Sequence, residues 1–333
     1  MMSRRGAYFV VLILLLLLFF IGDLLVGDVL YTPSEVIQAF LGGGNEGVGY
    51  IITKVRLTRV LVALIVGISL PVCGLMMQTM FENPLADPYI LGVSSGTSLG
   101  VALFMLGVPL LGSAVPQWVL DFGVLGAGWL GALLVLFLIL MLSRKIANIF
   151  GVLVVGVMLS YIVSSIIQIL QYYSSAEQLK LYTLWSLGSF SSITRSHLQL
   201  LVPVMAVGLL LSFFSIKSLN LQLLGDEYAQ TMGMNRKRTR MMVFGATTLM
   251  AGTVTTYCGP IGFIGLAMPH ATRYIFRTSD HAVLLPATML MGGIAMLLCD
   301  MIAKWLVIPI NSVTALLGIP IILKVVFSQL SRR

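Results

Sequence analysis

Charged side chains that could contact another protein concentrate in one short stretch of an otherwise apolar chain. Residues 217–240 read KSLNLQLLGDEYAQTMGMNRKRTR and place Asp226 next to Glu227. The same stretch holds five of the chain's twenty lysines and arginines. Such side chains form ion pairs and hydrogen bonds with the surface of a partner protein. We therefore interpret the stretch as a docking segment; the alternative is an ordinary loop whose charge cluster stops translocation.

Residue types used in catalysis or metal binding do not occur in a usable arrangement. The sequence has no G-x-x-x-x-G-K-[ST] motif, and hence no P-loop of its own. The spacing of serine, histidine and aspartate residues does not indicate a catalytic triad. The cysteines and histidines lack the spacing of a metal site or a disulfide framework, and they are Cys73, Cys258, Cys299, His197, His270 and His281. We predict that the chain is not an enzyme and binds no cofactor or metal itself.

The composition is that of a polytopic membrane protein. Apolar residues make up 58% of the 333 residues and charged residues only 10%, whereas soluble domains contain about 25% charged residues. The mean hydropathy is +1.02. The net charge of +8 does not indicate nucleic-acid binding, because the basic residues lie at the ends of apolar runs.

Apolar runs long enough to cross a bilayer predict an all-α protein with about ten transmembrane helices. The predicted spans are 7–30, 57–80, 89–110, 122–143, 148–171, 195–216, 241–258, 261–277, 282–303 and 311–328. The first run lacks a small-residue cleavage site, so we interpret it as a retained span and not a signal peptide. Residues 173–192 are expected to contain a short re-entrant or interfacial helix.

The orientation is predicted from the distribution of lysine and arginine. With both termini in the cytoplasm, fourteen basic residues fall on the inner side: Arg4, Arg5, Arg144, Lys145, Lys217, Arg236, Lys237, Arg238, Arg240, Arg273, Arg277, Lys324, Arg332 and Arg333. Six fall on the outer side: Lys54, Arg56, Arg59, Lys180, Arg195 and Lys304. This orientation places residues 217–240 in the cytoplasm.

Glycines divide the cytoplasmic stretch into short helical pieces. SLNLQLL precedes a break at Gly225, and Asp226 is expected to cap a helix of about two turns with Glu227 in its first turn. Gly233 is expected to end this helix as its C′ residue. The following basic cluster opposes the dipole of the next helix, so the topology rule or lipid phosphates are expected to explain it.

Four segments of the chain are distinctive in composition and order. They read VRLTRVLVALIVGISLPVCGLMMQ, NPLADPYILGVSSGTSLG, LLGDEYAQTMGMNRKRTR and GPIGFIGLAMPHATRYIF. Gly- and Pro-rich interruptions at 82–100 and 259–273 are typical of broken helices in transporters, although close helix packing is an alternative. Through these segments the whole chain resembles the FecCD-like permeases, which are subunits of type II ABC importers for vitamin B12, ferric siderophores and haem.

The resemblance implies one permease domain over residues 1–333, in the bacterial inner membrane. Its implied partners are a second permease subunit (as a homodimer when one permease gene is present), two cytoplasmic ABC ATPase subunits and a periplasmic substrate-binding protein. ATP and Mg²⁺ would act on the ATPase partners. The substrate would be a ferric siderophore, haem or cobalamin, because all of these importers share one permease pattern.

The resemblance also implies roles for particular residues. The stretch fits the loop that importers insert into their ATPases, with the coupling residues Leu224, Gly225, Asp226, Glu227, Ala229 and Gly233. Basic residues that face acids of the binding protein in this family correspond to Arg56, Arg59 and Lys304, the last of which is usually arginine. Anchoring to lipid headgroups is the alternative for Arg56 and Arg59.

The fifth predicted span lines the substrate path in this family. Its candidate path residues are Gln168, Gln171, Tyr172 and Ser164. Gln168 and Gln171 share a helix face because they are three residues apart. Hydrogen bonding between helices is the alternative role for these two amides.

Two positions depart from the family pattern. Glu82 stands where arginine is usual, and Asn311 stands where glycine is usual, in a turn whose usual acid is absent. An ion-coupled secondary transporter of a bulky solute is the alternative function. The acids favour the ABC importer, because they lie near predicted span ends and in loops, not in the middle of spans.

Overall fold

The computed structural model describes residues 4–27, 29–43, 45–89, 92–110, 117–143, 146 and 149–330. These residues form helices joined by turns and contain no strand. The predicted all-α fold is therefore confirmed for the described chain. Four basic residues used in the orientation prediction lie outside the described residues, namely Arg144, Lys145, Arg332 and Arg333.

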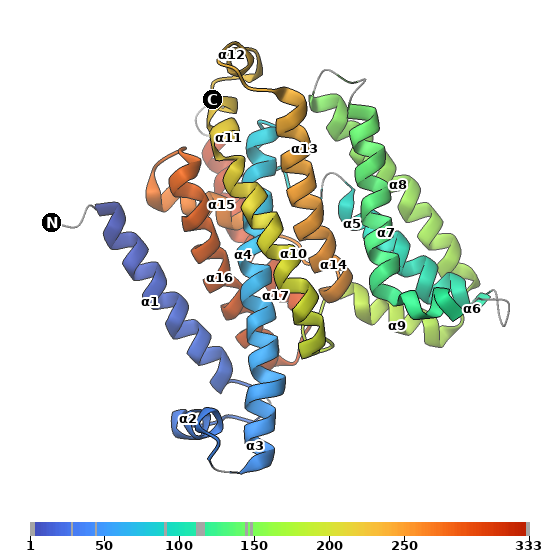
Figure 1. Cartoon of the computed structure of the whole chain (residues 1–333), viewed down its shortest axis with the longest axis vertical. Coiled ribbons are helices and arrows are strands. Elements are labelled where there is room, and N and C mark those ends of the chain that lie inside the picture. Colours follow the sequence, from blue (N-terminus) through green and yellow to red (C-terminus); the bar gives the residue numbers. More distant parts are fainter. Residues whose placement is uncertain are drawn as a thin grey trace. The chain divides into compact units, whose positions relative to one another are not determined.

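The helices follow one another in chain order (Figure 1), and the π-helical turns between them are named η in the text. They are α1 Arg4–Leu25, α2 Pro33–Leu41, α3 Glu46–Tyr50, η1 Ile51–Arg56, α4 Leu57–Met80, α5 Val93–Ala102, η2 Leu103–Gly107, α6 Val108–Leu110, α7 Gln117–Ser143, α8 Ile149–Tyr173, α9 Ala176–Ser186, α10 Arg195–Phe214, α11 Ile216–Gln222, α12 Asp226–Thr231, α13 Arg236–Thr247, η4 Thr248–Gly252, α14 Thr253–Cys258, α15 Ile264–Phe276, α16 His281–Leu306 and α17 Ile310–Leu330. Because η1 and η4 continue their neighbours, 46–80 and 236–258 are each one unbroken helix.

Among the described residues, seven helical stretches are long and apolar enough to cross a membrane. They are Arg4–Leu25, Glu46–Met80, Val93–Leu110, Gly123–Leu142, Gly151–Tyr173, Arg195–Phe214 and His281–Leu306. The three remaining predicted spans also coincide with helices, at 236–258, α15 and α17. The prediction of about ten helices is thus roughly matched. The helix expected between residues 173 and 192 is α9.

Residue contacts divide the chain into two compact units. The first consists of Met1–Leu75, Ser189–Ala206 and Gly262–Arg333, and the second of Met76–Gly188 and Val207–Ile261. Helices α4 and α10 each pass from one unit to the other. The single permease domain expected over residues 1–333 stays a prediction.

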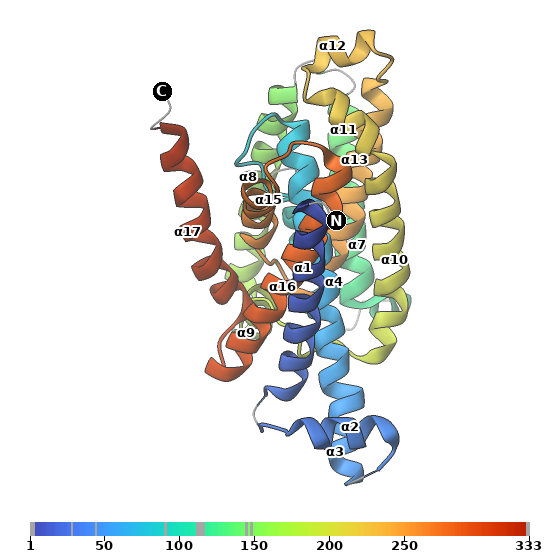
Figure 2. The same ribbon diagram turned by 90° about the vertical axis from the view of Figure 1, so that its left-hand side faces the viewer.

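In the first unit, small residues allow helices to approach closely. Helix α1 packs against α16, and α15 packs against α16 and α17 (Figure 2). A Cβ atom at Gly67 of α4 would lie 2.6 Å from the carbonyl oxygen of Gly292 in α16. Because no side chain fits at that distance, glycine at position 67 allows α4 and α16 to pack backbone to backbone.

In the second unit, glycines likewise allow α5 and α7 to pack closely against each other (Figure 1). A Cβ atom at Gly100 would lie 1.9 Å from the carbonyl oxygen of Ala127, and one at Gly131 would lie 2.0 Å from that of Gly96. The glycines of the VSSGTSLG segment are thus packing residues of a helix interface.

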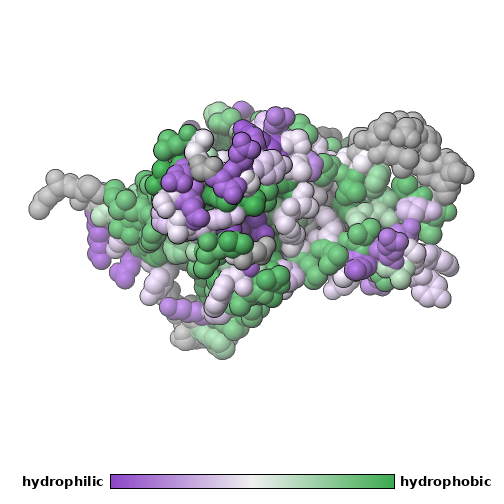
Figure 3. Space-filling model, turned by 90° about the horizontal axis from the view of Figure 1, so that it is seen from below, coloured by the Kyte–Doolittle hydropathy of each residue, from purple (hydrophilic) through white to green (hydrophobic). Residues whose placement is uncertain are grey.

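Much of the surface of the described helices is apolar. Large apolar side chains are exposed along α1, α7, α8 and α10, including Leu18, Phe137, Ile169 and Leu210. Figure 3 shows one face, on which apolar and hydrophilic residues each form patches. Apolar residues on the outside of long helices are the arrangement that a lipid environment favours.

Candidate functional site

The charged stretch between α10 and α13 folds as two short helices, as predicted. Helix α11 is held by Leu219 and Gln222, both of which are buried. Gly225 then breaks the chain with a φ of +90°, a left-handed conformation that residues with a Cβ atom rarely adopt. Helix α12 follows directly and has one turn and a half.

Gly233 ends α12 as predicted. It has a φ of +90°, and its N–H donates to the carbonyl of Gln230 at 2.9 Å. The N–H of Met234 donates to the carbonyl of Ala229 at 3.0 Å. These two hydrogen bonds form a Schellman motif, which satisfies the free carbonyls at the end of the helix. Ala229 and Met234 are also the buried residues of this turn.

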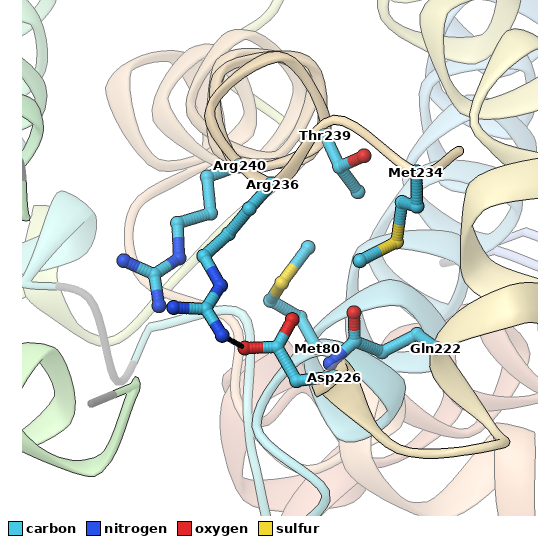
Figure 4. Close-up of a pocket in the computed structure, with 7 residues that line it drawn as sticks. All are labelled: Met80, Gln222, Asp226, Met234, Arg236, Thr239 and Arg240. Carbon is cyan, nitrogen blue, oxygen red and sulfur yellow. Dashed lines mark ion pairs between the residues drawn. The ribbon is translucent and has the colours of Figure 1, made fainter. Parts of the chain in front are cut away.

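The prediction that Asp226 caps α12 is wrong. Gly225 occupies the N-cap position and Asp226 is the first helical residue. The carboxylate of Asp226 forms an ion pair with the guanidinium of Arg236 in the first turn of α13 (Figure 4). An N-cap side chain must precede the helix to accept from its free N–H groups. Asp226 lies one residue past that position, so its carboxylate pairs with Arg236 instead.

The basic cluster at the start of α13 has partners inside the protein. Asn235 caps α13 by accepting from the N–H of Arg238 at 3.0 Å. Arg236 pairs with Asp226, and the buried Arg240 donates to the carbonyl of Ile146 at 3.3 Å. The expectation that topology or lipid must explain this cluster is therefore incomplete, because a carboxylate and a carbonyl offset two of the cations near the helix dipole.

The outer surface of this segment mixes apolar and acidic side chains. Glu227 is exposed, and so are Leu224, Tyr228 and Met232. The last two were not singled out from the sequence, although large apolar residues in a polar loop are a usable signal for a protein contact. An exposed, conformationally defined helix of this composition has the features of a docking element.

A second charged cluster lies in the first unit and joins α1, α4 and α16. The guanidinium of Arg59 donates to the carboxylate of Asp300 through Nε at 3.0 Å and Nη2 at 2.8 Å. Lys304 Nζ lies 2.9 Å from Asp300 and 2.7 Å from Asp23. Asp23 and Asp300 are fully buried. Two carboxylates paired with two cations keep this buried cluster neutral.

Arg56 is buried near the same helices. Its guanidinium donates to the carbonyls of Leu24 and Leu25, both at 3.0 Å, and to that of Val29. It also lies 4.3 Å from the centre of the Tyr31 ring, a cation–π contact. Arg56 therefore holds the chain that leaves α1 against the start of α4.

These contacts bear on the three predicted docking residues. Lys304 has only 5% of its side chain exposed, and Arg56 is also buried, whereas Arg59 has 25% exposed. The docking role stays a prediction for all three, and Arg59 is the best placed. Sequence reasoning missed Asp23 as a partner of Lys304; the signal available was an acid inside the first predicted span.

The predicted substrate-path residues lie on α8. Ser164, Gln168 and Tyr172 are four residues apart and exposed, so they form one polar stripe on the helix, while Gln171 is half-buried. Their role stays a prediction.

Both departures from the family pattern have local partners. The side chain of Asn311 accepts from the backbone N–H of Gly262 at 3.0 Å and so holds the start of the GFIGLAMPH segment. The Glu82 carboxylate accepts from the Gln222 side chain at 3.5 Å, which connects the turn after α4 to the end of α11.

Comparison with known proteins agrees with this arrangement. The FecCD transport family matches residues 14–328. The chain is 35% identical to the hemin transport system permease protein HmuU of Yersinia pestis, over 87% of this chain and 86% of that protein. It is 36% identical to the vitamin B12 import system permease protein BtuC of Klebsiella pneumoniae, over 81% of this chain and 80% of that protein.

The fold has a solved counterpart. A metal-chelate type ABC transporter in an inward-facing conformation superimposes with a TM-score of 0.82 and 29% identity, over 95% of this chain and 97% of that one. The ten helical regions, the two-helix charged segment and the match over nearly the whole sequence point to one conclusion. The chain belongs to the FecCD transport family and is a multi-pass permease subunit of an ABC importer.

Proposed function

We propose that this permease moves a ferric siderophore, haem or cobalamin from the periplasm to the cytoplasm, driven by ATP hydrolysis on partner subunits. The observation that carries the proposal is the exposed α12 segment in a chain that the family assigns to ABC importers. Permease subunits of such importers bind no cofactor, and ATP and Mg²⁺ act on the partner ATPase. This chain would therefore couple and guide transport without an ATPase site of its own.

In the proposed mechanism, residues 224–233 contact the ATPase. Support comes from the exposed Glu227, Tyr228 and Met232 beside the buried Ala229. A buried Ala229 and the glycine at position 233 keep the exposed side chains in one arrangement, which lowers the entropy lost on binding. Movement of the ATPase on binding ATP would then reach the helices through this segment.

The outer end would receive the binding protein. Arg59 carries this proposal, because its guanidinium is oriented by Asp300 and partly exposed, so it is placed to donate to a second carboxylate on a partner. The permease would work as a homodimer with both termini in the cytoplasm. Ser164, Gln168, Gln171 and Tyr172 of α8 would line the path as weakly interacting polar groups.

One observation favours the alternative of an ion-coupled carrier, since ionisable residues inside spans often belong to proton relays. Asp23 and Asp300 are such residues. Their carboxylates are already paired with Lys304 and Arg59, however, which supports a structural role for these acids.

Reconstitution tests the proposal. The permease would be placed in liposomes with its ATPase subunits and binding protein, and uptake of radiolabelled cobalamin, haem and a ferric siderophore measured. We expect uptake of one of these classes that requires ATP hydrolysis and persists with a protonophore. Uptake that needs a proton gradient and no ATP would contradict the proposal.

A further inference from the structure

We infer that the ion pair between Asp226 and Arg236 fixes the orientation of α12 on α13, and that these two are positioning residues for coupling. The coupling part of this inference rests on the proposed function; the positioning part concerns the permease alone. The two adjacent acids of the segment then have different tasks. Asp226 binds inside the protein, while Glu227 is exposed to a partner.

Helix α12 gains from such a contact because it is short and is flanked by two glycines with positive φ. It has six residues, and isolated helices of that length are unstable in water. Gly225 before it and Gly233 after it both have a φ of +90°, and no atom lies within 4 Å of a Cβ position at either glycine. Packing at these two joints therefore does not determine the direction of α12.

The ion pair adds a side-chain constraint between α12 and α13 to the anchoring by the buried Ala229 and the Schellman motif. Asp226 belongs to the first turn of α12 and Arg236 to the first turn of α13, so the contact closes the loop between the two helices (Figure 4). Their side chains are 26% and 30% exposed. A pair at this depth is weaker than a buried one and can break and re-form, as a coupling element that changes orientation requires.

The surroundings of the pair exclude a bound anion as its purpose. Figure 4 shows Arg240 beside Arg236, with Met80 and Met234 lining the same small pocket. The pocket has room for about 10 Å³, the size of a single water at most. Arg240 already donates to a backbone carbonyl. The acid that Arg236 meets in this pocket is Asp226, which supports a mechanical role and not a ligand site.

The path beyond the pair explains why the pair would matter for transport. Helix α13 continues through η4 and α14 as one unbroken helix to Cys258. A force on α12 would be transmitted through the ion pair to the first turn of this long helix. Without the pair, α12 would keep its anchor at the buried Ala229 and its Schellman hydrogen bonds, but its direction relative to α13 would be less well defined.

The positioning part is tested on the free permease by distances between spin labels. Labels at Tyr228→Cys on α12 and Met241→Cys on α13 use exposed sites, and the three native cysteines are buried. We expect a narrow distance distribution in the parent protein, a broad one in Asp226→Arg and in Arg236→Asp, and a narrow one again when both changes are combined. Arg238→Asp, an exposed arginine in the same turn, is the matched control and should stay narrow.

Three results would overturn the inference: a narrow distribution in either single variant, a broad one in the charge-swapped pair, or equal broadening in Arg238→Asp. Retention of a single monodisperse peak in size-exclusion chromatography confirms that each variant is folded. The charge-swapped double variant is a second control for folding. A narrow distance distribution in it cannot result from a general loss of structure.

The coupling part is tested in the reconstituted importer by the ratio of substrate taken up to ATP hydrolysed. Each single variant should lower the ratio roughly two- to fivefold, the factor that corresponds to one partly exposed ion pair, and the swapped pair should restore it. An unchanged ratio in the single variants would overturn the coupling part. If the distances change as expected but no ATPase binds the parent protein, the proposed function fails and the positioning part stands.

Discussion

Two ion-paired sites among the described residues of this permease both join aspartates to basic side chains, but in different environments. The Asp226–Arg236 pair is more than a quarter exposed on both sides, whereas Asp23 and Asp300 are fully buried around Lys304. Water screens the first site, so its contribution to stability is small and its geometry can change. The second site cannot lose one partner without leaving a charge unpaired in an apolar region. The difference separates a site suited to movement from one suited to holding helices together.

The largest effect is expected from removing the central cation of the buried cluster. Lys304→Met should lower the free energy of unfolding by about 3–5 kcal/mol, because it leaves two buried carboxylates without their shared partner. Adding Asp23→Asn should recover part of this loss. Lys54→Met, at an exposed lysine, is the control. Denaturant unfolding in detergent measures the stability of all three variants. Equal stability of Lys304→Met and Lys54→Met would contradict the structural role of the buried cluster.

An intermediate effect is expected from the end of α12. Gly233→Val should destabilise the segment by about 1–2 kcal/mol, because a β-branched residue at a φ of +90° is strained. Hydrogen exchange should show faster exchange at the Met234 amide, which donates to Ala229. Gly245→Ala, at a helical glycine with no atom near its Cβ position, should leave that amide unchanged. Unchanged protection in Gly233→Val would mean that the Schellman motif does not hold the segment.

A smaller effect is expected at the exposed edge of the buried cluster. Arg59→Gln should weaken binding of the periplasmic binding protein about threefold to tenfold at low salt, and less at high salt, because long-range attraction between exposed charges is screened. Its unfolding is measured as well, because Asp300 then keeps only Lys304 as a cationic partner. Arg56→Gln should have less effect on this affinity, since Arg56 is buried against backbone carbonyls. Surface plasmon resonance at two ionic strengths measures both. Equal losses of affinity in the two variants would show that exposure does not distinguish them.

The smallest effect concerns an exposed carboxylate outside both sites. The backbone N–H and then the hydroxyl of Thr32 lower the pKa of Glu35 in the capping box of α2. The stabilisation of α2 is therefore present above the usual carboxyl pKa and is lost as the pH falls through the lowered pKa. NMR titration of the Glu35 carboxylate should show the pKa rising part of the way toward 4.5 in Thr32→Ala, because the variant loses the hydroxyl and keeps the backbone N–H. An unchanged pKa in that variant would contradict the contribution of the Thr32 hydroxyl.

Sequence reasoning located the helices and the C-terminal end of α12 because those features are local. Apolar run length predicts spans, and Gly233 can be assigned from its spacing after DEYAQTM. The ion-pair partners could not be predicted in the same way. Asp23 and Lys304 are 281 residues apart, and whether Asp226 caps its helix or pairs with Arg236 depends on one residue of helix register. Contacts between residues that only the tertiary structure brings together could not be predicted from the pattern of residues.

The proposed contact of α12 with the ATPase is tested most directly by reversing its exposed acid. Glu227→Arg changes a side chain that projects from the folded segment, so the permease should remain folded. In the reconstituted importer we predict that this variant no longer co-purifies with the ATPase subunits and shows no ATP-dependent uptake. Full complex formation and parental uptake in Glu227→Arg would contradict the assignment of α12 as the coupling element.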